Sequence, residues 1–377
     1  MRRNLKVRIA LALCVLTFGS NLAPAQTSES KSEQKARLAE TVRGVIGPWI
    51  EKEEAPGVIV VVRQYGKTDF FPFGEADQAK HKPVTADSVF ELASITKVFA
   101  TTSLAIEVQA GQMKLDDHVA KYLPYLRKHG GDAKQITLEQ LATHTSSLPR
   151  TPVGKRPDGE WNKDLLMQWL AEWQAPQPPG TKSLYSNVAV GLLGYAIEQR
   201  EQKPLIEVWR EQFLVPLKMD HTFFEIPEDA ANRAVQAYGP KGQPIERSPV
   251  GGWPAGGRLK SSGRDMAHFL VANLGERTDL PEITKAMELA QKPYFKASQK
   301  MTQGLAWQRL NLQGEPVIDK NGGLSGTSTY IGMLPDQHVG VVVMANRGKC
   351  TATQVGRKLM FALVGKPPQG GSEGGEQ

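Results

Sequence analysis

Two pairs of strand-forming segments, one near each end of the chain, most constrain its fold. Residues 58–62 form an unbroken run of valine and isoleucine, and residues 69–73 follow after a polar turn. Residues 329–334 and 339–344 repeat this arrangement around a Pro-Asp-Gln-His connection. Because β-branched runs bounded by turn residues favour strands, and closely spaced strands favour hairpins, we expect antiparallel sheet at both ends of the chain.

Helical patterns lie outside both hairpins. Residues 36–52 have apolar side chains at helical spacing, with a kink expected at Gly47-Pro48, and residues 351–364 also have a helical pattern. The mirrored order predicts one discontinuous sheet-and-helix domain from residues 37–90 and 246–364. Residues 91–245 predict a mostly helical second domain. The expected fold class is therefore α/β of the α+β kind, an antiparallel sheet flanked by helices.

The first 25 residues have the composition of a secretory signal peptide. Four basic residues accompany an apolar stretch over residues 9–18, and Ala-Pro-Ala precedes Gln26. We expect cleavage after Ala25 and a periplasmic or secreted protein, although the paired arginines leave the export route open. A permanent membrane anchor is the less favoured alternative because the stretch is short, and no later segment predicts a membrane span.

Composition excludes several classes of function. Hydrophobic residues make up 40% and charged residues 23% of 377 residues, so the chain is not wholly disordered. The formal net charge is +7, and without the four basic residues of the signal peptide it falls to +3, which gives no case for nucleic-acid binding. Cys14 leaves with the signal peptide, so Cys350 has no intrachain partner and stability must come from burial.

Nothing in the sequence predicts a metal or a cofactor. The seven histidines are scattered, none forms the pair of a metalloprotease, and no glycine-rich phosphate loop is present. A Gly-x-Ser-x-Gly string at residues 370–374 lies in the low-complexity tail, residues 365–377. We expect this tail to be disordered and interpret the string as chance, since it lacks the strand and helix of a nucleophile turn.

Ser94 and Lys97 form a Ser-x-x-Lys pattern. The pattern itself is common, but this copy leads into an apolar helical run over residues 100–110, which ends at Gly111. Ser94 is therefore expected near a helix N-terminus, where free N–H groups stabilise an oxyanion, with Lys97 on the same face. A desolvated lysine can act as a general base toward serine. The alternative is a capping serine followed by a surface lysine.

Two further motifs are weak when taken alone. Tyr185 and Asn187 belong to a Tyr-Ser-Asn motif between a proline-rich loop and an apolar helical run, where a simple capping segment is the alternative. Lys320 begins a Lys-Asn-Gly motif before the Gly/Ser-rich residues 323–328 and a strand. A cation beside exposed strand N–H groups would suit a carboxylate and an oxyanion, and an exposed turn lysine is the alternative.

In this order the three motifs resemble those of the penicillin-recognising serine hydrolases, most of all the class C β-lactamases and their penicillin-binding relatives. Tyr-x-Asn follows Ser-x-x-Lys by 91 residues, and Lys-x-Gly stands near the C-terminus. The resemblance covers residues 37 to 364, and further stretches match the family: residues 141–149, 179–180, 191–194, 216–219, 301–307, 334–335 and 341–346.

The resemblance implies a β-lactamase/transpeptidase-like fold with the site between the sheet and the helical domain. It makes Ser94 the nucleophile that is acylated, and it gives Lys97 and Tyr185 a shared role in proton transfer. Tyr185, ionised by Lys97 and Lys320, would activate the deacylating water, and the titrations of these groups would be coupled. Asn187 would bind the amide carbonyl of the substrate.

The third motif departs from the family pattern. The resemblance implies that the backbone N–H groups of Ser94 and Gly323 form the oxyanion hole, next to the motif residues Asn321 and Gly322. The family usually has threonine at the place of Asn321, where its hydroxyl helps to hold the substrate carboxylate. A short connection before Lys320 also predicts a more open site. Both departures leave the substrate open, but not the acyl-enzyme chemistry.

We therefore predict an exported, monomeric serine hydrolase that opens β-lactam rings through an acyl-enzyme on Ser94. Three alternatives stay open: a penicillin-binding D-alanyl-D-alanine carboxypeptidase or endopeptidase acting on peptidoglycan peptides, an esterase on the same scaffold, and a silent protein that senses cell-wall fragments. A triad with His144 is disfavoured because Lys97 and Tyr185 already fill the role of base, so we expect His144 to be a hydrogen-bonded structural residue.

Overall fold

A nine-stranded antiparallel sheet crosses the molecule in the order β3-β2-β1-β13-β12-β11-β10-β9-β8. The computed structural model describes residues 30–53, 55–153, 161–247 and 252–366, so the expected signal peptide and the tail beyond residue 366 lie outside the described residues. The strands of the sheet are β1 (Gly57–Gln64), β2 (Lys67–Asp77), β3 (Lys82–Pro83), β8 (Phe295–Lys296), β9 (Met301–Gln303), β10 (Gln308–Leu312), β11 (Glu315–Leu324), β12 (Thr327–Leu334) and β13 (Val339–Ala345).

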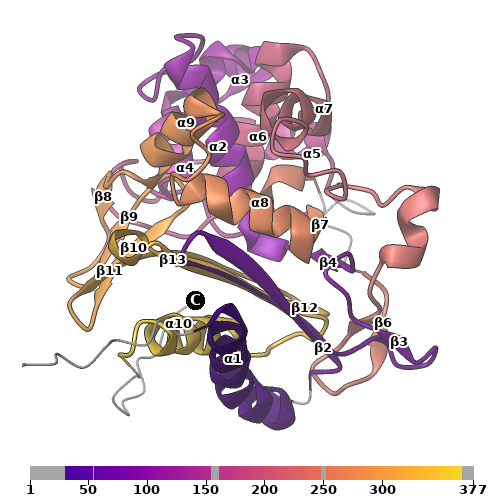
Figure 1. Cartoon of the computed structure of the whole chain (residues 1–377). Helices are drawn as coiled ribbons and strands as arrows, with labels where there is room; N and C mark the ends of the chain where they lie inside the picture. Colours follow the sequence, from indigo (N-terminus) through magenta and orange to yellow (C-terminus); the bar gives the residue numbers. More distant parts are fainter. Residues whose placement is uncertain (1–29, 54, 154–160, 248–251, 367–377) are drawn as a thin grey trace, which may run out of the picture.

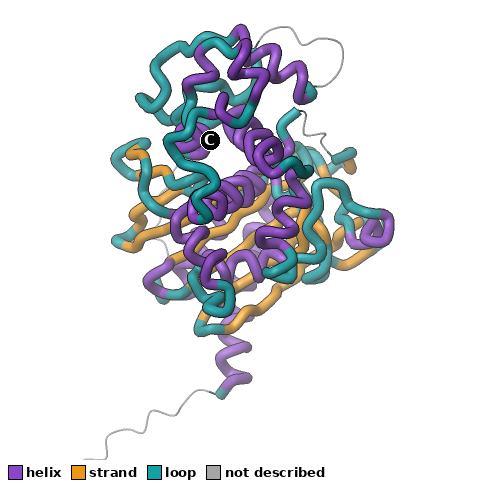
Figure 2. Tube along the Cα trace, turned by 90° about the horizontal axis from the view of Figure 1, so that it is seen from above, coloured by secondary structure: helices purple, strands orange, loops and turns teal. Residues whose placement is uncertain are grey.

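Helices cover both faces of this sheet (Figure 1). On one face, α10 packs on β12 and β13 and also contacts α1; on the other face, α8 packs on β1 and β13. The helices α2 to α7 and α9 lie on the same side of the sheet as α8 (Figure 1), and the view from above shows helices in front of the strands (Figure 2). The helices are α1 (Lys31–Glu53), α2 (Thr96–Gln109), α3 (Pro124–His129), α4 (Leu138–Ala142), α5 (Lys163–Glu172), α6 (Asn187–Glu201), α7 (Leu205–Trp209), α8 (Gly263–Asn273), α9 (Pro281–Gln291) and α10 (Ala352–Leu363).

This layered arrangement confirms the predicted fold class. Two smaller antiparallel pairs lie outside the main sheet: β4 (Val89–Glu91) with β7 (Lys260–Ser262), and β5 (Ala237–Tyr238) with β6 (Pro244–Ile245). Within the described ranges, no helix is both long and apolar enough to cross a bilayer.

The valine-rich run of β1 is explained by burial on both faces. Ile59 and Val61 belong to a core shared with the helices on the α8 side, whereas Val58, Val60 and Val62 belong to the core under α1 and α10. Because successive side chains of a strand point to opposite faces, only a continuous apolar run satisfies both cores. The hairpin predicted at each end of the chain is confirmed, β1 with β2 at one end and β12 with β13 at the other.

Helix α1 begins earlier than its apolar spacing predicts. Its start at Lys31 follows a reciprocal cap, in which the Ser30 hydroxyl accepts from the Glu33 N–H at 3.2 Å and the Glu33 carboxylate accepts from the Ser30 N–H at 2.7 Å. This cap draws the polar residues 31–35 into the helix, ahead of the apolar pattern that begins at residue 36. At its other end the helix continues through Pro48 to Glu53.

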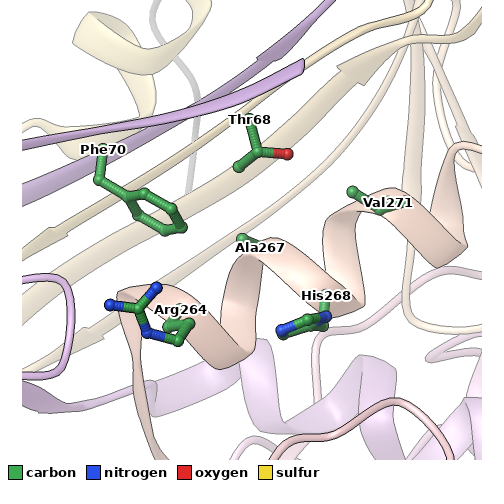
Figure 3. A pocket seen from close by; sticks show the side chains of 6 residues that line it. All are labelled: Thr68, Phe70, Arg264, Ala267, His268 and Val271. Atoms are coloured by element: carbon green, nitrogen blue, oxygen red, sulfur yellow. The ribbon is translucent and has the colours of Figure 1, made fainter. Parts of the chain in front are cut away.

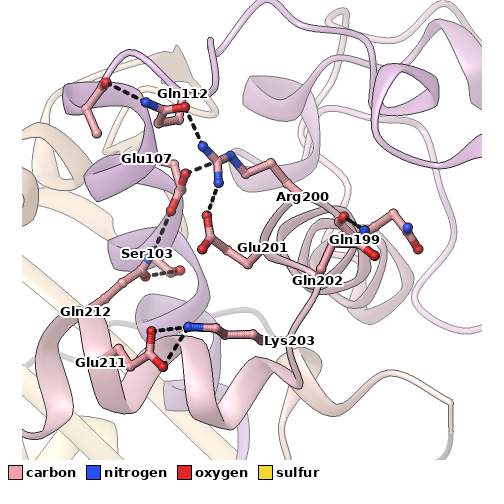
Figure 4. Close-up of polar contacts among 11 residues, drawn as sticks. Ser103, Glu107, Gln112, Gln199, Arg200, Glu201, Gln202, Lys203, Glu211 and Gln212 are labelled. Carbon is pink, nitrogen blue, oxygen red and sulfur yellow. Dashed lines mark hydrogen bonds and ion pairs between the residues drawn. The ribbon is translucent and has the colours of Figure 1, made fainter.

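A polar cluster joins the C-terminal parts of α2 and α6 (Figure 4). Arg200 of α6 forms an ion pair with Glu107 of α2, Nε to Oε2 3.3 Å, and a second one with the neighbouring Glu201. The Gln212 side chain donates to Glu107 Oε1 at 2.5 Å and accepts from the Ser103 hydroxyl at 2.5 Å. The two helices that carry Lys97 and Asn187 at their opposite ends are thereby tied together.

Candidate active site

Ser94 lies on a 3₁₀ turn, η1 (Ala93–Ile95), directly before α2. The preceding Ala93 has a φ of 49°, in the left-handed region that residues with a Cβ seldom adopt. Such a turn persists only when its surroundings hold it. Here the Thr329 hydroxyl of β12 donates to the Leu92 carbonyl at 2.9 Å, so the sheet fixes the residue that leads into the turn.

Strand β11 passes close beside this turn, and only glycine fits at position 322. A Cβ on Gly322 would lie 2.4 Å from both the Leu92 carbonyl oxygen and the Thr329 hydroxyl, and 3.0 Å from the Ser94 nitrogen. At Gly323, in contrast, an added Cβ would meet no atom within 4 Å. Strand β11 therefore contacts the serine turn at Gly322, whereas the space beside Gly323 is unfilled.

The third motif lies inside β11, a separate strand that was not predicted and that precedes the predicted strand of residues 329–334. Lys320 pairs with Ile331 and Gly323 with Ser328, so the motif and the glycines after it already belong to the ladder. Lys320 is 2% exposed, and its Nζ lies 4.9 Å from the centroid of the Tyr185 ring. Burial lowers the pKa of Lys320, and the nearby positive charges act in the same direction.

Lys97 is fully buried and points at Ser94. Its Nζ donates to the Ser94 hydroxyl oxygen at 3.2 Å, to the Asn187 side-chain oxygen at 2.7 Å, and to the Gly256 carbonyl. Desolvation holds the pKa of Lys97 well below its ordinary value, and the charge of Arg150 lowers it further. The neutral amine, which can accept a proton, is therefore favoured.

Tyr185 reaches the same hydroxyl from the other side. Its OH donates to Ser94 Oγ at 2.6 Å. Three cationic groups surround its ring, at distances from the centroid of 4.8 Å for Lys97, 4.9 Å for Lys320 and 5.4 Å for Arg150. Two proton-transfer groups thus converge on one serine oxygen, which is the arrangement that activates a nucleophile.

The loop before α6 is clamped to the segment that ends at Arg150. The Ser186 hydroxyl caps α6 by accepting from the Ala189 N–H at 2.9 Å, and it donates to the Pro149 carbonyl at 2.7 Å. The Asn187 N–H donates to the Arg150 carbonyl at 3.1 Å. These bonds fix Tyr185 and Asn187, the two neighbours of Ser186, relative to the serine turn.

His144 has a structural place beside this loop. Its buried ring lies 4.7 Å from the Tyr185 ring, centroid to centroid, and its Nδ1 accepts from the Ser186 N–H at 3.3 Å. Burial holds the pKa of His144 well below its usual range, with Lys320 and Lys97 adding to the effect. This neutral, hydrogen-bonded histidine agrees with the role expected from the sequence.

The structure brings most of the sequence-derived site residues into one cluster. Ser94, Lys97, Tyr185 and Asn187 are joined by hydrogen bonds, and Lys320 faces the same tyrosine ring. The strand residues Asn321, Gly322 and Gly323 follow Lys320 along the edge of this cluster.

Sequence reasoning missed two contributors to this cluster, Arg150 and the Gly256 carbonyl. Arg150 comes directly after the family-like stretch 141–149, so its position was a usable signal. A backbone acceptor such as the Gly256 carbonyl gives no signal in the sequence.

A separate pocket of about 320 Å³ lies between β2 and α8 (Figure 3). Its lining consists of Thr68, Phe70, Arg264, Ala267, His268 and Val271. It shares no residue with the cluster around Ser94, and Arg264 is already engaged by Asp87, with Nε to Oδ1 2.8 Å. No hydrogen bond or ion pair among the described residues joins a nucleophile to a base in this pocket, whereas Ser94 contacts both Lys97 and Tyr185, so the serine cluster is the candidate site.

The fold matches those of solved β-lactamases, a class C β-lactamase among them. A class C β-lactamase from Rhodobacter sphaeroides matches with a TM-score of 0.78 and 28% identity, over 86% of this chain and 99% of the other. A β-lactamase from Sulfitobacter sp. EE-36 matches with a TM-score of 0.78 and 26% identity, over 88% and 97%.

Sequence comparison agrees with the structural match. The β-lactamase of Yersinia enterocolitica is 32% identical over 362 residues, which is 86% of this chain and 90% of the relative. The β-lactamase of Escherichia coli K12 is 29% identical, over 82% of this chain and 89% of the relative. The β-lactamase family model matches residues 38–362, so the chain belongs to the β-lactamase family and the resemblance of the three motifs is confirmed.

Proposed function

We propose that this protein is a serine β-lactamase that opens β-lactam rings through an acyl-enzyme on Ser94. The observation that carries the proposal is the convergence on one oxygen: Lys97 Nζ lies 3.2 Å and the Tyr185 hydroxyl 2.6 Å from Ser94 Oγ. Membership of the β-lactamase family gives the substrate class.

In the acylation step, Ser94 Oγ attacks the lactam carbonyl carbon and gives up its proton to Lys97 or Tyr185. The ring C–N bond then breaks, and the ring nitrogen takes up a proton from this pair. The lowered pKa of Lys97 supports the role of proton acceptor, because only the neutral amine has a free electron pair. The backbone N–H groups of Ser94 and Gly323 would stabilise the oxyanion.

The remaining residues hold the substrate. Asn187 Oδ1 accepts from Lys97 at 2.7 Å, which leaves the amide hydrogens of Asn187 to donate to the acyl-amide carbonyl of the substrate. Lys320 and Asn321 lie on the opposite wall, on β11, where a cation and an amide suit the ring carboxylate. In deacylation a water attacks the ester carbonyl carbon and passes a proton to Tyr185. The ester C–O bond to Ser94 then breaks, Ser94 Oγ takes a proton back from the pair of Tyr185 and Lys97, and the ring-opened acid leaves.

We also propose that the protein acts outside the cytoplasm as a monomer. The composition of residues 1–25 supports export. The division into a sheet-and-helix domain and a mostly helical domain, with the site between them, is part of the same proposal. Ser94 and Asn187 come from the helical segment, and Lys320 comes from the sheet.

Substitution of the nucleophile tests the proposal. Ser94→Ala should lower kcat/KM for a chromogenic cephalosporin by at least about a thousandfold, because the Ser94 hydroxyl is the nucleophile that both Lys97 and Tyr185 contact. An unchanged thermal unfolding midpoint would show that the fold is intact. Activity within about tenfold of the parent would contradict the assignment of Ser94.

A further inference from the structure

We propose that Arg150 forms an anion-binding subsite beside Asn187, and that this subsite favours β-lactams with a second carboxylate on the acyl side chain. The inference rests on the proposed β-lactamase function and refines its substrate class. It concerns a residue that neither the motifs nor the family resemblance identified.

The first support is the charge of Arg150, which stands beside two buried basic side chains and has no carboxylate partner among the described ion pairs. Arg150, Lys97 and Lys320 all lie within 5.4 Å of the Tyr185 ring centroid. The charge of Arg150 is felt by both lysines, since it lowers the pKa of each. Among the ion pairs of the described residues, none joins any of these three cations to a carboxylate. A substrate anion would therefore meet the charge of Arg150, which no described carboxylate pairs.

The second support is the position of Arg150 relative to the proposed substrate contacts. Its carbonyl accepts from the Asn187 N–H at 3.1 Å, so its backbone is fixed beside the residue assigned to the acyl-amide group. The ring carboxylate is assigned to the other wall, at Lys320 and Asn321. The backbone of Arg150 is therefore held on the Asn187 side of the site, which is the side assigned to the acyl side chain.

The third support is the chemistry and exposure of the side chain. Arg150 is exposed, unlike the two buried lysines, so its guanidinium is accessible from solvent while it lies over the tyrosine ring. A guanidinium presents a planar fork of donors that matches a carboxylate in a bidentate manner. A side-chain carboxylate on a bound β-lactam is an anion of the required geometry.

A matched pair of penicillins tests the subsite. Carbenicillin differs from benzylpenicillin by one carboxylate on the acyl side chain, so the ratio of their kcat/KM values isolates the effect of that group. Arg150→Gln should lower the ratio of carbenicillin to benzylpenicillin by about tenfold, and Arg150→Lys should lower it less. Arg127→Gln, an exposed substitution on α3 with the same loss of charge, should leave the ratio unchanged.

The outcomes separate this proposal from the proposed function. An equal loss for both penicillins, or no loss, would overturn the subsite and leave Arg150 as a group that only stacks on Tyr185. If the parent protein hydrolyses neither penicillin, the proposed function fails, and the subsite is then judged from the ratio of the two acylation rates by intact-protein mass. A ratio that Arg150→Gln leaves unchanged in that assay would overturn it as well.

Discussion

At the scale of single residues, burial turns an ordinary lysine into a base. Lys97 has three hydrogen-bond acceptors around its Nζ but no carboxylate among its described partners, and desolvation lowers its pKa. The neutral form should therefore be present at pH values well below the ordinary lysine range. Activity that needs this form falls as the pH drops through the lowered pKa, which is where we expect the acidic limb of the acylation profile.

The clearest prediction at this scale concerns Asn321. Asn321→Thr should lower KM for penicillins by up to about tenfold, because a threonine hydroxyl can donate to the ring carboxylate with less bulk than an amide. Steady-state kinetics with benzylpenicillin would measure the change, and a short-chain ester without a carboxylate provides the control substrate. An unchanged or higher KM would show that Asn321 does not limit carboxylate binding.

Which residues meet at Ser94 could largely be predicted from the sequence. Motif spacing identified Lys97 and Tyr185 because both act through their side chains, and the sequence gives the type and spacing of side chains. Arg150 and the Gly256 carbonyl could not be assigned in the same way. Their contribution depends on how the segments after α4 and before β7 fold back on the serine turn.

At the scale of elements, a buried hydrogen-bond network fixes β11 to α10, on the face of the sheet that α10 covers. Asp319, next to Lys320, is 1% exposed and accepts from Tyr330 at 3.0 Å and from Arg357 of α10 at 2.7 Å. A Cβ on Gly356 would lie 2.1 Å from the Tyr330 ring, so α10 can approach only through a glycine. Helix and strand are thereby locked together directly behind the third motif.

We predict that this network contributes strongly to stability. Arg357→Ala should lower the free energy of unfolding by about 3–5 kcal/mol, because it leaves the buried Asp319 carboxylate without its ionic partner. Urea unfolding would measure the loss, with the exposed Arg127→Ala as the matched control. The pair would be shown to be dispensable if both variants unfold at the same urea concentration.

Element boundaries were predictable where apolar periodicity sets them and not where polar contacts do. The terminal hairpins and the C-terminal helix follow from buried runs that must satisfy two cores. The start of α1 depends on the cap at Ser30, and β11, which was not predicted as a strand, lies against the serine turn at Gly322. Neither contact changes the hydrophobic pattern.

At the scale of the whole molecule, one core joins the sheet to the helices above it. Residues of β1, α2, α6, α8 and α9 all belong to the same buried cluster, and α1 and α10 enclose a second core on the opposite face. The segments of the proposed domains are therefore packed together on the α8 side of the sheet. The polar cluster of Figure 4 adds a pH-sensitive contact between α2 and α6.

That contact predicts how stability depends on pH. Desolvation first, and then the charge of Glu201, raise the pKa of Glu107 from 4.5 to about 7. The folded state therefore binds this proton more tightly than the unfolded chain. The resulting stability is fully present below pH 4.5 and is lost as the pH rises through 7.

Thermal unfolding across this range checks the effect. Glu107→Gln, which imitates the protonated form, should unfold at a temperature that falls less between about pH 5 and pH 8 than that of the parent protein. Glu211→Gln changes an exposed carboxylate of the same region, paired with Lys203, and should keep the parent dependence. If the unfolding temperatures of the parent and of Glu107→Gln change with pH by the same amount, the raised pKa assigned to Glu107 is contradicted.

The most direct test of the central claim is a time course of intact-protein mass with excess benzylpenicillin. We expect the penicillin to be hydrolysed completely while the protein returns to its free mass, with one transient adduct per chain that Ser94→Ala abolishes. A lasting adduct would contradict rapid deacylation and indicate a penicillin-binding peptidase. Neither adduct nor hydrolysis would contradict β-lactam chemistry at Ser94 altogether.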